Sequence, residues 1–156
     1  MFVPFDQIDG NSRVWIYQSD RSISTQEKSV IQTHLDNLCA NWNTHGAPVH
    51  CSYFLKDWFI CLFVDESKNN ASGCSIDSSV ATIKKIEQEF NIDFFNRLNI
   101  AFIDGKNPKV LPLSEFKNVI NENLMVFNNL VKTKKEMESS WIIPIQNSWL
   151  AKYLVK

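Results

Sequence analysis

Glycine is scarce in this chain of 156 residues, which has four, at positions 10, 46, 73 and 105. None of them starts a Gly-x-x-x-x-Gly-Lys-Ser or Gly-x-x-x-x-Gly-Lys-Thr sequence, the loop whose amides and lysine hold nucleotide phosphates. Gly105 is followed by Lys106, but Asn107 and Pro108 come next in a predicted hairpin turn. We therefore expect no ATP hydrolysis above background.

Positive charge is not in excess either. Only three of the sixteen basic residues are arginine, and seventeen acidic residues bring the net charge to −1. The densest basic run, at 132–135, is followed at once by Glu136 and Glu138. Because binding to a phosphate backbone depends on clustered lysine and arginine, we expect no nucleic-acid partner.

Long apolar runs and cysteine pairs are also lacking. The longest apolar run, Trp58 to Val64, is far shorter than the roughly 20 residues of a membrane span. Residues 1–6 show no basic region followed by an apolar stretch, which an export signal would have. The four cysteines, at 39, 51, 61 and 74, form no Cys-x-x-Cys pair. These features predict a cytoplasmic protein with reduced thiols and no membrane partner.

The histidines do not form a metal-binding pattern. All three lie between His34 and His50, with Cys39 and Cys51 interleaved, but structural zinc sites usually pair ligands two to four residues apart. Cys39 belongs to the apolar stripe of a predicted helix, and His50 and Cys51 should point to opposite faces of a strand. We expect no metal and, with no cofactor-binding loop in the sequence, no cofactor.

Apolar residues make up 44% of the chain and aromatic residues 12%, which is ample material for a hydrophobic core. We predict one domain over residues 1–156. A strand is expected at Arg13–Gln18, and a helix after Ser24, whose spacing from Glu27 is that of a capping box. Alternation predicts an edge strand from Val49 to Leu55.

The strand predicted from Trp58 to Val64 is apolar on both faces and should therefore be central. A second helix with apolar positions from Ile76 to Phe90 follows, then strands at Leu98 to Ile103 and Val110 to Leu113. The order strand, helix, strand, strand, helix, strand predicts an α+β fold with a ferredoxin-like (βαββαβ) core. This core covers about residues 12–113, and a C-terminal extension covers 114–156.

Both faces of the central strand must be covered, but two helices on one side of a sheet cover only one of them. We expect the other face to be covered by residues 114–156 or by a second subunit. The extension itself is predicted to hold a short helix near Phe116, a strand from Trp141 to Ile145 and a final helical turn capped by Ser148.

Three stretches, 12–18, 71–77 and 127–131 with Thr133 and Lys134, resemble those of a small bacterial family. Its members commonly carry the label ABC transporter ATPase, and the resemblance covers nearly the whole chain. It implies no catalytic role for any residue. The label would imply the phosphate-binding loop that the four glycines do not provide.

The sharpest candidate site is the turn that leads from the central strand into the second helix. Free backbone amides at a helix N-terminus attract anions and lower the pKa of a nearby thiol. The turn therefore predicts a site for a small anion. Its residues are Asp65, Glu66, Ser72, Gly73, Cys74 and Ser75.

Two other interpretations of this turn remain open. Cys74 could be the nucleophile of a thiol-dependent enzyme, with His45 or His50 as its base. Alternatively, Asp77 or a neighbouring serine caps the helix and Cys74 only fills space, which is the interpretation we favour.

A second candidate is the segment Asn128–Thr133, with Trp141, Ser148 and Trp149 after it, which combines polar donors with indoles. Turn formation and core packing explain the same residues. Because the sequence has no recognisable catalytic pattern, we expect a non-catalytic domain that binds a partner protein, a second copy of itself or a small anion. The alternative is the thiol enzyme at Cys74.

Overall fold

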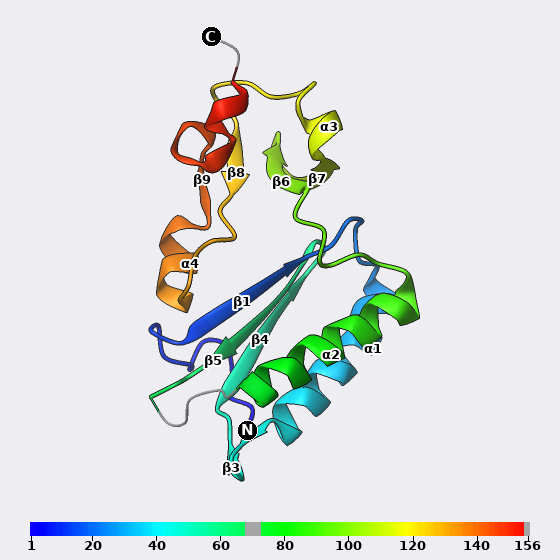
Figure 1. The fold of residues 1–156 in the computed structure, drawn as a ribbon, viewed down its shortest axis with the longest axis vertical. Helices are drawn as coiled ribbons and strands as arrows, with labels where there is room; N and C mark the ends of the chain where they lie inside the picture. Colours follow the sequence, from blue (N-terminus) through cyan, green and yellow to red (C-terminus); the bar gives the residue numbers. More distant parts are fainter. Residues whose placement is uncertain (68–72, 155–156) are drawn as a thin grey trace.

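Two antiparallel sheets organise the chain, and Figure 1 shows the second above the first along the long axis. The computed structural model describes residues 1–67 and 73–154, with the backbone alone for 73–75. The first sheet has three strands in the order β1-β5-β4, and the second has four in the order β7-β6-β8-β9. A small hairpin of β2 (Asn43–Thr44) and β3 (Ala47–Pro48) forms a third sheet.

The first sheet matches the predicted strand pattern. It consists of β1 (Arg13–Gln18), β4 (Cys51–Lys56) and β5 (Phe59–Val64). All six residues of β5 are buried, and this strand lies between the other two. The predictions of a central strand and of an edge strand before it are confirmed.

Two long helices, α1 (Thr25–Asn41) and α2 (Gly73–Phe90), lie side by side on one face of this sheet (Figure 1). The predicted capping box is present, because Ser24 Oγ accepts from the Glu27 amide at 3.1 Å and Glu27 Oε1 accepts from the Ser24 amide at 3.0 Å. Among the described helices, none combines the length and the apolar character needed to cross a bilayer.

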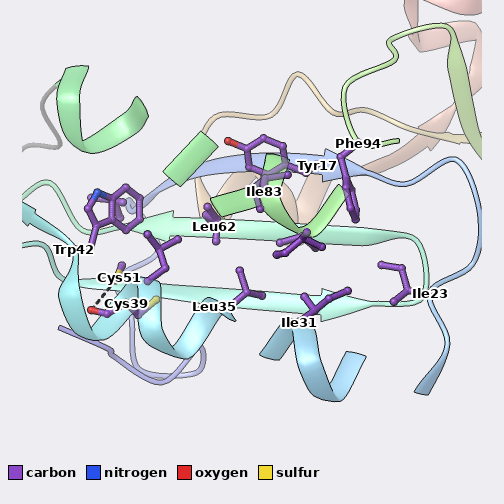
Figure 2. Packing of buried hydrophobic residues seen from close by; sticks show 14 of the residues in the cluster. Tyr17, Ile23, Ile31, Leu35, Cys39, Trp42, Cys51, Leu62, Ile83 and Phe94 are labelled. Carbon is purple, nitrogen blue, oxygen red and sulfur yellow. Dashed lines mark hydrogen bonds between the residues drawn. The ribbon is translucent and has the colours of Figure 1, made fainter. Parts of the chain in front are cut away.

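The core between helices and sheet is seen in Figure 2. Apolar side chains of both helices meet those of the β5 face that points toward them, with Trp42 at one end of the core and Ile23 and Phe94 at the other. The fully buried members include Ile31, Leu35, Ile60, Leu62, Ile83 and Ile86. Each such aliphatic side chain contributes about 1.5–3 kcal/mol through its removal from water, before the entropy of folding is subtracted.

The opposite face of β5 is covered by segments from both ends of the chain. The Phe5 ring lies 5.2 Å from the Phe63 ring, and the Trp141 ring lies 4.7 Å from the Phe59 ring, measured between centroids. The prediction that residues 114–156 cover this face is confirmed. The contribution of the N-terminal residues was not predicted.

The second sheet contains β6 (Asn99–Asp104), β7 (Asn107–Pro112), β8 (Met125–Phe127) and β9 (Ile142–Pro144). The short helix α3 (Leu113–Phe116) follows β7, and α4 (Lys134–Ser140) lies between β8 and β9. Two 3-10 helices, η1 (Ile145–Asn147) and η2 (Trp149–Tyr153), follow β9. These elements enclose a separate core around Phe102, Phe116 and Val126.

The α+β class is confirmed, but the ferredoxin-like arrangement is not. That arrangement requires the fourth predicted strand to join the first sheet, whereas its counterpart β6 lies in the second sheet. The start of the β1 edge is bonded by the C-terminal extension instead. The Val14 amide donates to Lys132 O at 3.0 Å, and the Lys134 amide donates to Ser12 O at 2.9 Å.

Candidate functional site

A cleft of about 720 Å³ lies where the end of β1 approaches the second sheet. Its walls come from parts of the chain that are far apart in sequence. They are residues 16–18 of β1, the loop and strand at 94–101, the segment 127–130 after β8, and residues 148–150 at the start of η2.

The loop before β6 is held in place by two aspartates. Asp93 Oδ1 accepts from the amides of Phe95 at 2.9 Å and Asn96 at 3.2 Å. Asp20, just after β1, accepts from the Asp93 amide at 2.9 Å. Because side chains satisfy the loop amides, the loop keeps a defined shape at the rim of the cleft.

A chain of three hydrogen bonds connects the walls. Gln18 Nε2 donates to Asn99 O at 2.8 Å, and Asn129 Nδ2 donates to Gln18 Oε1 at 2.9 Å. Trp141 Nε1 then donates to Asn129 Oδ1 at 2.9 Å. We call Gln18, Asn99, Asn129 and Trp141 the amide relay. Through it, β1, β6, the segment after β8 and the end of α4 fix one another's positions.

Apolar side chains around the cleft are exposed to solvent. Leu130 is 74% exposed and Leu98 is 61% exposed, and Phe95 and Trp149 are exposed to a lesser degree. Phe95 also makes an edge-on contact with Tyr17, with ring centroids 5.6 Å apart. Exposed apolar side chains gathered around one concave surface are typical of binding sites.

No family model, curated protein or solved structure matches the chain. The chemistry of the cleft is therefore argued from its own residues. Among the described residues that line it there is no cysteine, histidine, aspartate or glutamate, and Arg97 is the charged one. Burial raises the pKa of Tyr17, which keeps its hydroxyl protonated. The cleft can thus bind a molecule, but it offers no nucleophile paired with a base.

Part of this lining was among the predicted candidates. Asn128, Asn129, Ser148 and Trp149 all line the cleft, and Trp141 belongs to the relay. Thr133 has a structural role instead, since its Oγ1 accepts from the Glu136 amide at the start of α4.

The residues at 94–99 were missed. The signal that could have found them is Asp93 followed by Asn96, a pair typical of turns, with Phe95 between them as an apolar residue that continues no strand or helix pattern. In sequence, exposed apolar residues of this kind look the same as core residues.

The turn before α2 is only partly described. Helix α2 is described from Gly73 onward, within the predicted helix start at 72–75, whereas Ser72 and the side chains of 73–75 lie outside the described residues. Asp77 falls in the second turn, beyond the amides that a cap would satisfy, and the expected cap at this residue is not confirmed.

The two carboxylates of the predicted anion site bond to nearby groups. Asp65 Oδ1 accepts from the amide of Ser67 at 3.0 Å and from its hydroxyl at 2.6 Å. Glu66 Oε1 lies 3.5 Å from Arg13 Nη1. The anion site and the reactive Cys74 therefore remain predictions.

The histidines are dispersed. His34 Nε2 lies 2.7 Å from Glu89 Oε2, a contact that joins α1 to α2. His45 occupies the turn between β2 and β3 with φ of 50°, and His50 immediately precedes β4. In residues 1–67 and 76–154, no three His, Cys, Asp or Glu side chains gather as metal ligands would.

Three cysteines are described, and all are buried and unpaired. Cys51 Sγ donates to Cys39 O at 3.8 Å, the contact drawn in Figure 2. Interaction with Cys51 and burial raise the pKa of Cys39, and burial raises the pKa of Cys61. Both thiols stay protonated, so neither is an activated nucleophile.

Proposed function

We propose that this chain is a non-catalytic binding domain whose ligand occupies the cleft at the end of β1. One observation supports the proposal above all: exposed apolar side chains surround a fixed relay of amide groups in a cleft whose described lining residues pair no nucleophile with a base. A volume of about 720 Å³ is in the range of sites for small organic molecules.

The relay favours binding for an energetic reason. The entropic cost of binding is smaller when the groups that contact the ligand are already held in place, because fewer side chains lose conformational freedom on association. Gln18 and Asn129 are fixed by bonds to three different segments before any ligand arrives. Leu98 and Leu130 would then supply the apolar area that binding removes from water.

The test is a titration of the ¹⁵N-labelled protein with a collection of small soluble organic molecules, followed by amide chemical shifts. We expect the shift changes of bound molecules to concentrate in residues 16–18, 94–101 and 127–130. Leu130→Ser should weaken binding at least several-fold, whereas Val30→Ser, which removes an exposed apolar residue of α1, should not. Shift changes located elsewhere, or equal effects of the two variants, would contradict the proposal.

A thiol-dependent reaction at Cys74 is the second candidate. It is supported by the start of α2 at Gly73, which puts Cys74 in the first turn of an 18-residue helix, where the helix dipole lowers a thiol pKa. Rapid alkylation of Cys74 by iodoacetamide in the native protein at pH 6.5 is expected in that case. Slow alkylation rules this candidate out.

The cytoplasmic location of the protein and its membership of the small bacterial family are also part of the proposal. A reducing cytoplasm suits three buried, unpaired cysteines. Kinship with the small bacterial family is supported by the resemblance of the three sequence stretches alone. A ferredoxin-like arrangement would require the counterpart of β6 to join the first sheet.

A further inference from the structure

The amide side chains that line the cleft keep more free donors than free acceptor positions. Asn96 Oδ1 accepts from the Leu98 amide at 2.9 Å, and Asn128 Oδ1 accepts from the Leu130 amide at 3.2 Å. The oxygens of Gln18 and Asn129 accept within the relay. Four of the five lining amides therefore have an occupied oxygen.

The amide nitrogens of the same residues are less occupied. Each carries two hydrogens. Gln18 and Asn129 each donate one of them within the relay, and Asn96 and Asn128 donate neither to any residue that the structure describes. Because each oxygen has two lone pairs, the four side chains keep four acceptor positions against six N–H donors, so donors are in excess.

Arg97 adds a positive charge, which favours the same kind of ligand as the N–H donors do. It lies in the loop before β6, is exposed, and has no ion pair or hydrogen bond with the described part of the chain. Asp93, the carboxylate of the same loop, already accepts from two amides and does not line the cleft. The guanidinium fork fits a carboxylate with two parallel hydrogen bonds.

We infer that the ligand of the cleft is a small organic carboxylate with an apolar or aromatic body. This inference depends on the proposed function, because it names the ligand class of the same site. The carboxylate would meet Arg97 and the amide donors, and the body would contact Phe95, Leu98, Leu130 and Trp149. A cation would find no opposite charge among the described lining residues.

The charge count favours a monoanion over a phosphate ester. Phosphate carries close to two negative charges at neutral pH and usually binds several cations or a glycine-rich loop. Arg97 is the single charged group among the described lining residues, and the apolar walls contribute no charge. One guanidinium with neutral donors matches one carboxylate.

The experiment compares acids with their own uncharged amides on the intact protein. The pairs are 4-phenylbutyrate with 4-phenylbutanamide, 1-naphthylacetate with 1-naphthylacetamide, and octanoate with octanamide, each titrated while the amide shifts of 94–101 and 127–130 are followed. We expect at least one acid to bind about tenfold more tightly than its amide, the gain of one charge-assisted contact.

Variants assign the preference to its residue. Arg97→Gln should remove the preference for the acid and leave the affinity of the amide unchanged. Arg13→Gln, which changes an exposed arginine at the other end of β1, should keep the preference. Thermal melting of both variants checks that they are folded.

Each outcome decides the matter. Equal binding of acid and amide in the cleft, or a preference that survives Arg97→Gln, overturns the carboxylate inference and leaves the binding function standing. No shift change in the cleft with any of the six compounds overturns the carboxylate inference, and failure of the wider collection overturns the binding function as well. Stronger binding of the tripeptide Ala-Ala-Phe with a free C-terminus, relative to the six compounds, would assign the site to a partner protein.

Discussion

Lys134 is a charged side chain in a buried position, only 6% exposed. Its Nζ donates to Phe5 O at 2.6 Å and Ile8 O at 3.0 Å, and lies 4.6 Å from the centroid of the Phe5 ring. The ammonium thus compensates for its burial with two carbonyls and an aromatic face. It fastens the N-terminal residues over the face of β5 that the long helices leave open.

Lys134→Met should destabilise the protein by about 2 kcal/mol or more, because it removes bonds to a charged donor and leaves two carbonyls without it. Urea unfolding measures the loss. Lys135→Met is the control, since the side chain next in sequence is exposed. Equal stability of the two variants would show that the contacts of Lys134 contribute nothing.

Glu27 links a helix cap to an ion pair. Hydrogen bonds from Arg21 and from the Ser24 amide hold the pKa of Glu27 at about 2, below its usual range. A carboxylate with a lowered pKa in the folded state stabilises the fold at pH values above its unfolded pKa, about 4.3, and this contribution is lost as the pH falls toward 2.

Glu27→Gln keeps an oxygen for the cap but removes the charge. We expect a loss of about 1 kcal/mol at pH 7, kept modest by the solvent exposure of the pair. The difference from the wild type should shrink between pH 4.5 and 2, as measured by urea unfolding at several pH values. Glu122→Gln, at an exposed position, is the control. A difference that does not change with pH would contradict this account.

At the scale of elements, α4 is a helix of seven residues that lies against the β1 edge. So short a helix gains little from its own hydrogen bonds, and its cap counts for more. Thr133→Ala removes the side chain that accepts from the Glu136 amide and should cost about 1 kcal/mol. Thermal unfolding should show the loss, whereas Ser139→Ala, in the last turn of α4, should have a much smaller effect.

Local sequence signals were sufficient for the first sheet and its helices. The capping box at Ser24 and the apolar run ending at Val64 each determine one element through short-range physics. The position of β6 could not be obtained in this way, because it depends on which segment takes the free edge of β1. The segment that does, around Lys132, has no strand-like alternation and pairs with residues more than a hundred positions earlier.

The cleft was predictable only in part, because some of its walls show no local signal in the sequence. Asn128 and Asn129 stood out as polar residues outside regular elements, and Trp149 stood out as an indole next to the Ser148 cap. Their partners across the cleft, such as Gln18 and Asn99, belong to strands whose sequences give no sign of a site. The contact between them follows from the way the second sheet meets the first.

At the scale of the whole molecule, the amide relay connects the two sheets. Asn129→Ala removes two of its hydrogen bonds and should cost about 1–3 kcal/mol. Faster hydrogen exchange at 127–130 is expected at the same time, with Asn123→Ala, an exposed residue of another loop, as the control. Unchanged exchange at 127–130 would mean that packing alone positions this segment.

The pairing of residues 12–14 with 132–134 also has a consequence for biosynthesis. Synthesis runs from the N-terminus, so β1, β4 and β5 are made long before the segment that covers their second face. Until about residue 141 has left the ribosome, the cover over Phe59 and Phe63 is incomplete, because Trp141 and the bonds of Lys134 to the N-terminal residues are not yet in place. The nascent chain therefore exposes an aromatic surface during most of its translation. We expect a chaperone to bind this surface during that interval.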